Sequence, residues 1–214
     1  MPRRILIADD HLLVQEGIAR LLTPQFDVVG MVLNGRELVD EAQRLNPDVV
    51  VVDVGMPELN GIEATRRLAK LVPETKIVIL TQQLAPEYVQ AAFAAGARAY
   101  VAKQSAASEL VTAIEMVIAD RYYVTPQANK EAAYLASLNS RKNPAEFFGG
   151  KLTPRQREVL QLVAEGRSTK EISSLLHISP KTVEFHRNSI MDELGIRSIA
   201  ELTRYAILQG IVSA

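Results

Sequence analysis

The chain has 214 residues, 48% hydrophobic and 23% charged, a composition that excludes disordered and fibrous proteins and leaves room for two globular domains. It contains no cysteine, which excludes disulfides and thiolate metal sites, and no apolar run of the roughly 20 residues that a transmembrane helix needs. The net charge is −1. Residues 1–125 are acidic, with 12 Lys and Arg against 16 Asp and Glu, and the C-terminal part is mildly basic.

Short apolar segments rich in β-branched residues alternate with helical stretches, such as 12–22 and 84–95, over the first 120 residues. Each segment is nearly continuous in apolar character, as a strand covered on both faces must be. The alternation predicts an α/β domain with a doubly wound, five-stranded parallel sheet. The expected strands are 5–8, 28–32, 49–52, 77–80 and 99–102.

The strand-like segments stop after Tyr122 and Tyr123, so we place the first domain at residues 1–122. Residues 123–150 read as a linker, partly helical over 127–138, within which Phe147 and Phe148 are expected to pack. Residues 151–214 have only helical patterns and are expected to form a small all-α domain. The expected helices are 154–165, 169–177, 180–194 and 198–209.

Polar residues stand at the carboxyl ends of four of the predicted strands. Asp9 and Asp10 follow the first strand, Asp53 the third, Thr81 the fourth and Lys103 the fifth. Because sites in open parallel sheets form outside the carboxyl ends of the strands, we expect these side chains to converge. Oxygen ligands suit Mg²⁺, and a cation together with a lysine can neutralise a phosphoryl group that a carboxylate attacks.

Residues 1–120 resemble a response-regulator receiver domain, which has a flavodoxin-like fold. The resemblance rests on the acid pair, the segment Asp53-Val54-Gly55-Met56-Pro57 with Gly61, and then Thr81, Tyr100 and Lys103.

The resemblance implies that Asp53 accepts a phosphoryl group from a sensor histidine kinase or a small phosphodonor. It also implies a Mg²⁺ cofactor held by Asp10, by Asp9 often through water, by Asp53 and by the carbonyl group of Gly55. No turnover enzyme is expected.

Thr81 would hydrogen-bond the phosphoryl group, Lys103 would pair with it, and Tyr100 would swing inward as Thr81 moves. Three residues depart from the family's pattern. Gln82 stands where a small residue is usual, which bears on the speed and lifetime of phosphorylation, and Gln104 replaces a proline that often follows a cis peptide bond. Gly55 adds no side chain to the pocket.

Residues 171–183 have helix-turn-helix spacing, with Ser179 able to cap the longer second helix. On that helix Val183, Ile190 and Leu194 recur at helical intervals and should face the core. The opposite face is then free to enter a DNA groove.

On that face Asn188 can pair with adenine, Glu184 can accept from cytosine and Phe185 can touch a thymine methyl group. The basic and hydroxyl side chains beside them suit phosphate or sugar contacts. The expected DNA-contacting residues are Lys181, Thr182, Glu184, Phe185, His186, Arg187 and Asn188.

The segments Leu152-Thr153-Pro154-Arg155-Gln156-Arg157-Glu158-Val159-Leu160, Lys181-Thr182-Val183-Glu184-Phe185-His186 and Leu194-Gly195 resemble a LuxR-type helix-turn-helix. With the receiver in front, the whole chain resembles the NarL/FixJ family of transcription regulators. The resemblance implies a cytoplasmic, phosphorylation-switched regulator of a bacterial two-component system that binds inverted-repeat DNA as a homodimer, without a membrane partner. Asp192 and Glu193 replace the family's usual basic residues, and such acids would repel phosphate.

Three other functions agree less well with the sequence. A Mg²⁺-dependent phosphohydrolase would need a second acid two residues beyond the nucleophile, where Gly55 stands. A phosphorylation-independent DNA-binding scaffold draws support from Gln82 alone. An autoinducer-binding protein is excluded because the N-terminal half has the wrong architecture. Whether an unphosphorylated chain would be inactive through masking of its recognition helix or through lack of dimerisation stays open.

Overall fold

The computed structural model describes residues 2–131, 152–209 and 211–212. They form two compact units, one built on a sheet and one entirely helical. Phe147, Phe148 and the expected helical residues beyond 131 lie outside the described residues. Within the described ranges, no helix is long and apolar enough to cross a membrane.

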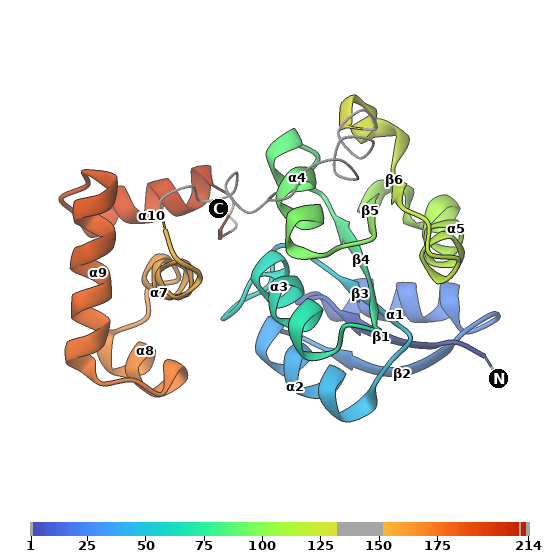
Figure 1. Cartoon of the computed structure of the whole chain (residues 1–214), viewed down its shortest axis with the longest axis horizontal. Helices are drawn as coiled ribbons and strands as arrows, with labels where there is room; N and C mark the ends of the chain where they lie inside the picture. The colour runs from blue at the N-terminus through green and yellow to red at the C-terminus, as the bar shows by residue number, and fades with distance from the viewer. Residues whose placement is uncertain (1, 132–151, 210, 213–214) are drawn as a thin grey trace. The chain divides into compact units, whose positions relative to one another are not determined.

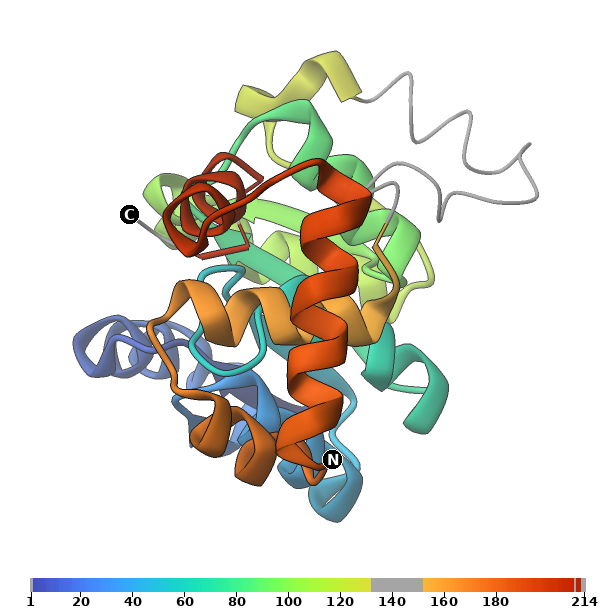
Figure 2. The ribbon, with the colours of Figure 1, turned by 90° about the vertical axis from the view of Figure 1, so that its left-hand side faces the viewer.

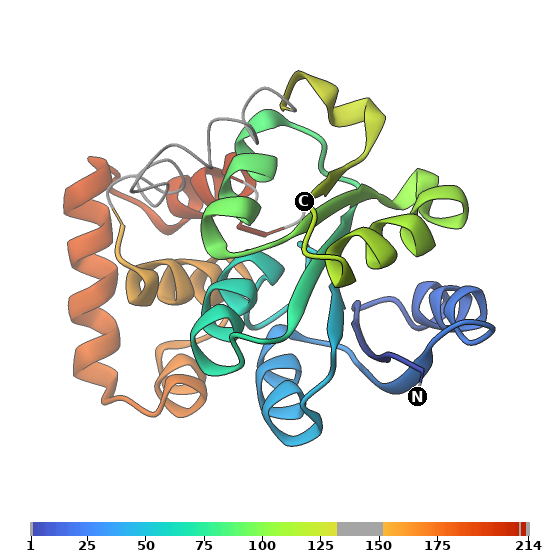
Figure 3. The ribbon, with the colours of Figure 1, turned by 45° about the vertical axis from the view of Figure 1, so that its right-hand side comes forward.

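The first unit is built on a parallel sheet with the strand order β2-β1-β3-β4-β5-β6 (Figure 3). The expected α/β class and the five expected strands are confirmed, with ends that differ by no more than one residue. β3, a run of four valines, is buried on both faces, which explains its continuous apolar character. The strands are β1 (Arg4–Ala8), β2 (Asp27–Val32), β3 (Val49–Val52), β4 (Lys76–Thr81), β5 (Ala99–Ala102) and β6 (Tyr123–Val124).

The sixth strand is a correction to the five-stranded expectation. β6 pairs in parallel with β5, and its residues lie where the sequence analysis starts a linker. The next residues, η2 (Pro126–Glu131), form a 3-10 segment that packs against α4 (Pro86–Ala95). A strand of two residues carries no periodic pattern, so only its partner strand defines it.

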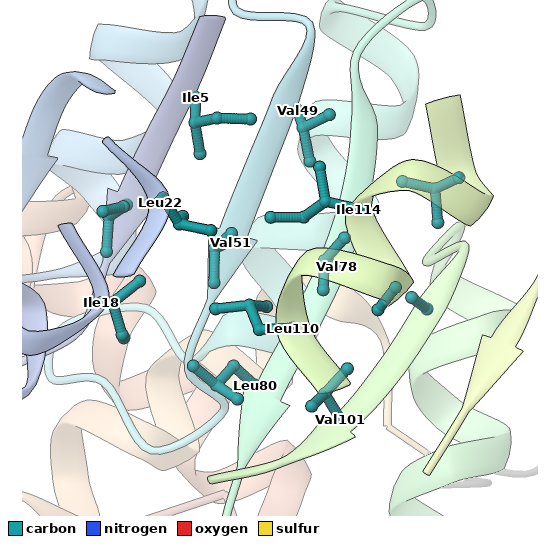
Figure 4. Packing of buried hydrophobic residues seen from close by; sticks show 14 of the residues in the cluster. Ile5, Ile18, Leu22, Val49, Val51, Val78, Leu80, Val101, Leu110 and Ile114 are labelled. Atoms are coloured by element: carbon teal, nitrogen blue, oxygen red, sulfur yellow. The ribbon is translucent and has the colours of Figure 1, made fainter. Parts of the chain in front are cut away.

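Helices cover both faces of the sheet (Figures 1 and 3). α1 and α5 lie on one face, where Ile18 and Leu22 of α1 and Leu110 and Ile114 of α5 pack against alternate strand residues such as Val51 (Figure 4). α2, α3 and α4 lie on the other face. Their bounds are α1 (Leu12–Leu22), α2 (Gly35–Leu45), α3 (Gly61–Leu71), α4 (Pro86–Ala95) and α5 (Ala106–Ile118), which follows the 3-10 turn η1 (Lys103–Ser105).

The second unit has the expected helices around its own core (Figure 2). Each helix begins after a hydroxyl residue whose side chain accepts a hydrogen bond from a backbone N–H group of the first turn, and α7 and α8 have complete capping boxes. The helices are α7 (Pro154–Ala164), α8 (Thr169–Leu176), α9 (Pro180–Leu194) and α10 (Ile199–Leu208).

Gly61 lets the first turn of α3 approach the loop after β3. A Cβ atom at this position would lie 2.0 Å from the backbone oxygen of Asp53, a contact that backbone atoms cannot relieve cheaply. The N–H group of Gly61 donates to the carbonyl group of Val54 at 3.0 Å and fixes the same loop. Gly61 is therefore required by the backbone that carries Asp53.

We expect Gly61→Ala to lower the free energy of unfolding by about 2 kcal/mol or more, because either α3 or the Asp53 loop must shift. The control is Gly17→Ala in α1, where a Cβ atom would meet nothing within 4 Å. That change should stabilise the chain by about 0.4–1 kcal/mol, and urea denaturation measures both. Similar free energies for the two variants would contradict the close approach of α3.

Candidate functional site

The parallel sheet brings the five polar residues expected at the strand ends to one edge of the first unit. Asp9 and Asp10 follow β1, Asp53 follows β3, Thr81 ends β4 and Lys103 follows β5. β1 and β3 are neighbours, and the N–H group of Asp53 continues their ladder by donating to the carbonyl group of Ala8 at 2.9 Å. The predicted convergence at this sheet edge is thus present in the structure.

The ammonium group of Lys103 lies between two buried carboxylates. Its Nζ atom is 2.7 Å from Oδ2 of Asp9 and 2.8 Å from Oδ2 of Asp53. Burial alone would lower the pKa of this ammonium group, but the charge and hydrogen bonds of Asp53 and Asp9 outweigh burial and raise the pKa. The contribution of Lys103 to stability is therefore complete at neutral pH and is lost only as the pH rises through its folded-state pKa, above the value of about 10.4 for a free lysine.

Both carboxylates are also held by backbone groups. Oδ1 of Asp53 accepts a hydrogen bond from the N–H group of Val54 at 2.8 Å, and Oδ1 of Asp9 accepts one from the N–H group of His11 at 3.0 Å. Asp53 is 6% exposed and Asp9 is 1% exposed. These contacts fix the orientation of both side chains before any ligand binds.

Asp10 and His11 extend the acidic cluster toward solvent. The Nδ1 atom of His11 lies 2.8 Å from Oδ1 of Asp10 and 3.4 Å from Oδ1 of Asp9. One possible ligand atom from each of these three residues lies within 4.8 Å of the others. The pattern of polar residues at strand ends does not predict a role for His11, and its position directly after the acid pair is the signal that the sequence offers.

The donor set fits a hard divalent cation such as Mg²⁺. Asp9, Asp10 and Asp53 supply three carboxylates, and the ammonium group of Lys103 pairs with two of them, Asp9 and Asp53. A buried cluster with this excess of negative charge favours a cation at its open side. Gly55 lies in the loop two residues beyond Asp53 and is half-buried. Its place in the sequence is the one at which the resemblance expects a carbonyl ligand.

Thr81 and Tyr100 are joined through the backbone of Gln83. The hydroxyl oxygen of Thr81 accepts a hydrogen bond from the N–H group of Gln83 at 3.2 Å, and the hydroxyl group of Tyr100 donates to the carbonyl group of Gln83 at 2.5 Å. Tyr100 is fully buried, which raises the pKa of its phenol far above the ordinary value, so it remains a donor. Sequence reasoning missed Gln83 because a backbone group leaves no signature in the side-chain pattern.

Gln82 and Gln104, the two glutamines that depart from the family's pattern, lie in different surroundings. Gln82 is exposed directly after Thr81. Gln104 lies within η1, and the described residues contain no cis peptide bond.

In the second unit, α9 buries one face and exposes the other. Val183 and Ile190 are buried, and Leu194 is partly buried against the same core, as the spacing predicts. Of the residues expected to contact DNA, Lys181, Glu184, Phe185 and Asn188 are exposed, and Thr182, His186 and Arg187 are half-buried.

Phe185 is a large hydrophobic residue on the exposed face of this helix, as the sequence predicts. Its side chain is 68% exposed and meets the ring of His186 edge to face, with centroids 5.8 Å apart. The ring therefore lies on the face of α9 opposite to the one that Val183 and Ile190 bury in the core. Asp192 and Glu193 are also exposed, about two turns further along the helix.

α7 holds the two helices of the motif in place. The amide of Gln156 donates to the hydroxyl oxygen of Ser189 in α9 at 3.0 Å. Arg155 donates to the carbonyl group of Leu176, at the end of α8, at 2.6 Å and pairs with Glu158 at 2.9 Å. These residues belong to the segment 152–160 that carries part of the family resemblance, but their contacts depend on tertiary structure.

Comparison with known families agrees with both units. Residues 5–115 match the response regulator receiver domain, and residues 150–206 match the bacterial regulatory proteins of the luxR family. The chain therefore belongs to the two-component response regulators that join a receiver to a LuxR-type DNA-binding domain. It is a transcription regulator of this type.

Individual relatives extend over nearly the whole chain. It is 36% identical to the response regulator GacA of Pseudomonas viridiflava, over 99% of this chain and 98% of the relative. It is 33% identical to the response regulator protein VraR of Staphylococcus saprophyticus, over 99% and 100%. Among solved structures, a LuxR-family response regulator from Aurantimonas sp. SI85-9A1 matches with a TM-score of 0.59 and 36% identity, over 64% of this chain and 99% of that chain. A complex of the response regulator RcsB with DNA matches with a TM-score of 0.57 and 26% identity, over 96% and 98%.

We expect Lys103→Met to lower the free energy of unfolding by about 3–5 kcal/mol, because it leaves two buried carboxylates without a counter-charge. Lys76→Met is the control, since Lys76 pairs with Asp120, whose side chain is 70% exposed, and should cost less than about 1 kcal/mol. Urea denaturation without divalent cations measures both. The double variant Lys103→Met/Asp53→Asn should recover part of the loss. Equal losses for Lys103→Met and Lys76→Met would show that the shared ammonium group is not what holds the site.

Proposed function

We propose that this response regulator is phosphorylated on Asp53 and that the phosphoryl group controls DNA binding by the second unit. The observation that carries the proposal is the arrangement around Lys103, whose ammonium group lies within hydrogen-bond distance of both Asp53 and Asp9. A nucleophilic carboxylate, a cation-binding cluster and an ammonium group beside one another are the components that phosphoryl transfer requires.

In the proposed reaction an oxygen of Asp53 forms a bond to phosphorus. The bond from phosphorus to the donor breaks at the same time, and the donor leaves as acetate or as the imidazole of a sensor histidine kinase. Lys103 is already oriented toward Asp53 and would pair with the new phosphoryl oxygens. Mg²⁺ held by Asp9, Asp10 and Asp53, with the carbonyl group of Gly55, would neutralise charge on the transferring group.

Thr81 and Tyr100 are proposed to pass the change on. Thr81 would hydrogen-bond the phosphoryl group and would then release the N–H group of Gln83. Because the hydroxyl group of Tyr100 donates to the carbonyl group of the same residue, movement of the Gln83 backbone would reach Tyr100. The exposed Gln82, beside Thr81, is proposed to affect how fast the phosphoryl group enters and leaves.

The exposed face of α9 is proposed to read the major groove. Asn188, Glu184 and Phe185 would contact base edges, and the remaining expected residues, Lys181, Thr182, His186 and Arg187, would contact the backbone or support these contacts. The RcsB complex supports DNA binding by a chain of this type. Asp192 and Glu193 would limit phosphate contacts at the far end of the helix and so reduce affinity without abolishing it.

We further propose that the active form is a homodimer on inverted repeats about one or more helical turns apart, in the cytoplasm. We assign residues 151–214 to DNA binding. β6 and η2 belong with the receiver by their packing, so the proposed receiver runs past residue 122 and the proposed linker is shortened to about 132–150.

Intact-mass spectrometry after incubation with acetyl phosphate and Mg²⁺ tests the chemistry. We expect one labile phosphoryl adduct on the wild type and none on Asp53→Asn, because only Asp53 among the buried aspartates lies in the proposed attacking position. Asp27→Asn, which alters an exposed aspartate of β2, is the control and should be modified like the wild type.

An adduct on Asp53→Asn would contradict the assignment of the phosphoacceptor. No adduct on the wild type with any donor or cation would favour the phosphorylation-independent scaffold. Sustained release of phosphate from a donor that is not an acyl phosphate would favour the phosphohydrolase.

A further inference from the structure

The segment 123–128 is attached directly to the strand that carries Tyr100. The N–H group of Tyr123 donates to the carbonyl group of Arg98 at 3.1 Å, and the N–H group of Thr125 donates to the carbonyl group of Tyr100 at 2.8 Å. This segment directly precedes the residues that connect the two units in the sequence. A movement of β5 is therefore transmitted to it through backbone hydrogen bonds.

Side chains join the same segment to α5. The hydroxyl groups of Thr125 and Tyr123 both donate to Oε2 of Glu109, at 2.5 Å and 3.0 Å. Thr125 is fully buried, and the oxygen Oε1 of Gln127 also lies 2.8 Å from its hydroxyl group, so both acceptors belong to the same cluster of side chains. Burial and the bond to Glu109 raise the pKa of Tyr123 to about 12, which keeps its phenol protonated and donating at neutral pH.

A third side chain reaches the turn that carries Lys103. The amide nitrogen Nε2 of Gln127 donates to the hydroxyl oxygen of Ser105 at 3.0 Å. Ser105 is the last residue of η1, which begins at Lys103, and it is 9% exposed. Ala128, one residue further on, is buried where η2 packs against α4. The segment is thus bonded to η1 and to α5, the two elements that follow β5 in the chain.

We propose that Tyr123, Thr125 and Gln127, with their partners Ser105 and Glu109, form a clasp that senses the phosphoryl site and passes its state to the connection between the units. In this structure the clasp is closed while Lys103 is bound to two carboxylates. A phosphoryl group on Asp53 would draw Lys103 toward itself and pull η1 with it. The bond between Ser105 and Gln127 would then lengthen and the clasp would open.

The inference rests on the proposed phosphorylation of Asp53 and adds the route by which its effect leaves the receiver. Coupling of this kind is reciprocal in free energy. If occupancy of the phosphoryl site opens the clasp, then breaking the clasp must make occupancy more favourable. Gln127 and Ser105 are thus positioning residues, which act through Lys103 and do not contact the phosphoryl group themselves.

The first arm of the test is amide hydrogen exchange in residues 123–128 of the full chain, with Mg²⁺ and with or without beryllofluoride as the phosphoryl analogue. We expect faster exchange at Thr125 in the presence of beryllofluoride, because the amide bonded to Tyr100 becomes exposed. Exchange in the buried strand β3 should not increase and serves as the internal control.

The second arm is the affinity for beryllofluoride of Ser105→Ala and Gln127→Ala. Each variant should bind it about twofold to tenfold more tightly than the wild type, the effect of one hydrogen bond. Ser105→Thr keeps the hydroxyl group and should restore the wild-type affinity. Thr75→Val is the matched control: Thr75 is also 9% exposed, and its hydroxyl group donates to the carbonyl group of Pro47 at 2.9 Å at the opposite edge of the sheet. That variant should lower stability without a change in affinity.

Two results would overturn the clasp while leaving the proposed function intact. One is binding of beryllofluoride with unchanged exchange in residues 123–128. The other is an affinity of Ser105→Ala and Gln127→Ala equal to that of Thr75→Val. Failure of the wild-type chain to bind beryllofluoride and to accept a phosphoryl group from acetyl phosphate would instead overturn the phosphorylation on which the clasp rests, and the clasp with it.

Discussion

Two buried carboxylates that share one ammonium group are the constraint on which the rest of this structure depends. Asp9 and Asp53 come from neighbouring parallel strands, and Lys103 from a strand two places further along the sheet holds both. Buried charge of this kind is tolerated only when its partners are fixed, which the backbone does here through Val54 and His11. Gly61 serves the same end, because only a residue without a Cβ atom lets α3 begin so close to the Asp53 backbone. With Asp10 added, the cluster carries excess negative charge that suits a divalent cation. A phosphoryl group on Asp53 would then give Lys103 a new partner without requiring a new helix or strand.

Much of this arrangement can be predicted from the sequence because it follows from local patterns and one topological rule. Continuous β-branched runs such as β3 indicate strands that are covered on both faces, and parallel strands place their carboxyl ends at one edge. The convergence of Asp53, Thr81 and Lys103 follows from that rule alone. In the second unit, Ser179 and the spacing of Val183 and Ile190 are local signals that define the start and the buried face of α9. The exposed position of Phe185 then follows by exclusion.

The features that sequence reasoning missed depend on tertiary contacts. β6 has two residues and is a strand only because β5 lies beside it. Thr81 and Tyr100 are linked through the backbone of Gln83, and a backbone contact leaves no signature in the pattern of side chains. Ser105 and Gln127 are 22 residues apart in sequence, and no periodicity relates them. The start of α4 is different, because a local signal accounts for it: α4 begins at Pro86, two residues later than the apolar pattern predicts, since proline is favoured in the first turn and Ala85 before it is extended.

The proposed switch requires the chemistry at Asp53 to set the DNA affinity of the second unit. The most direct test is the affinity of the full chain for a duplex selected from a random pool, measured by fluorescence anisotropy with Mg²⁺, with and without acetyl phosphate, at one fixed salt concentration. The account predicts binding about fivefold or more tighter for the phosphorylated wild type, the size of a typical allosteric coupling, and no change for Asp53→Asn. Equal affinities for both chains under both conditions would contradict it.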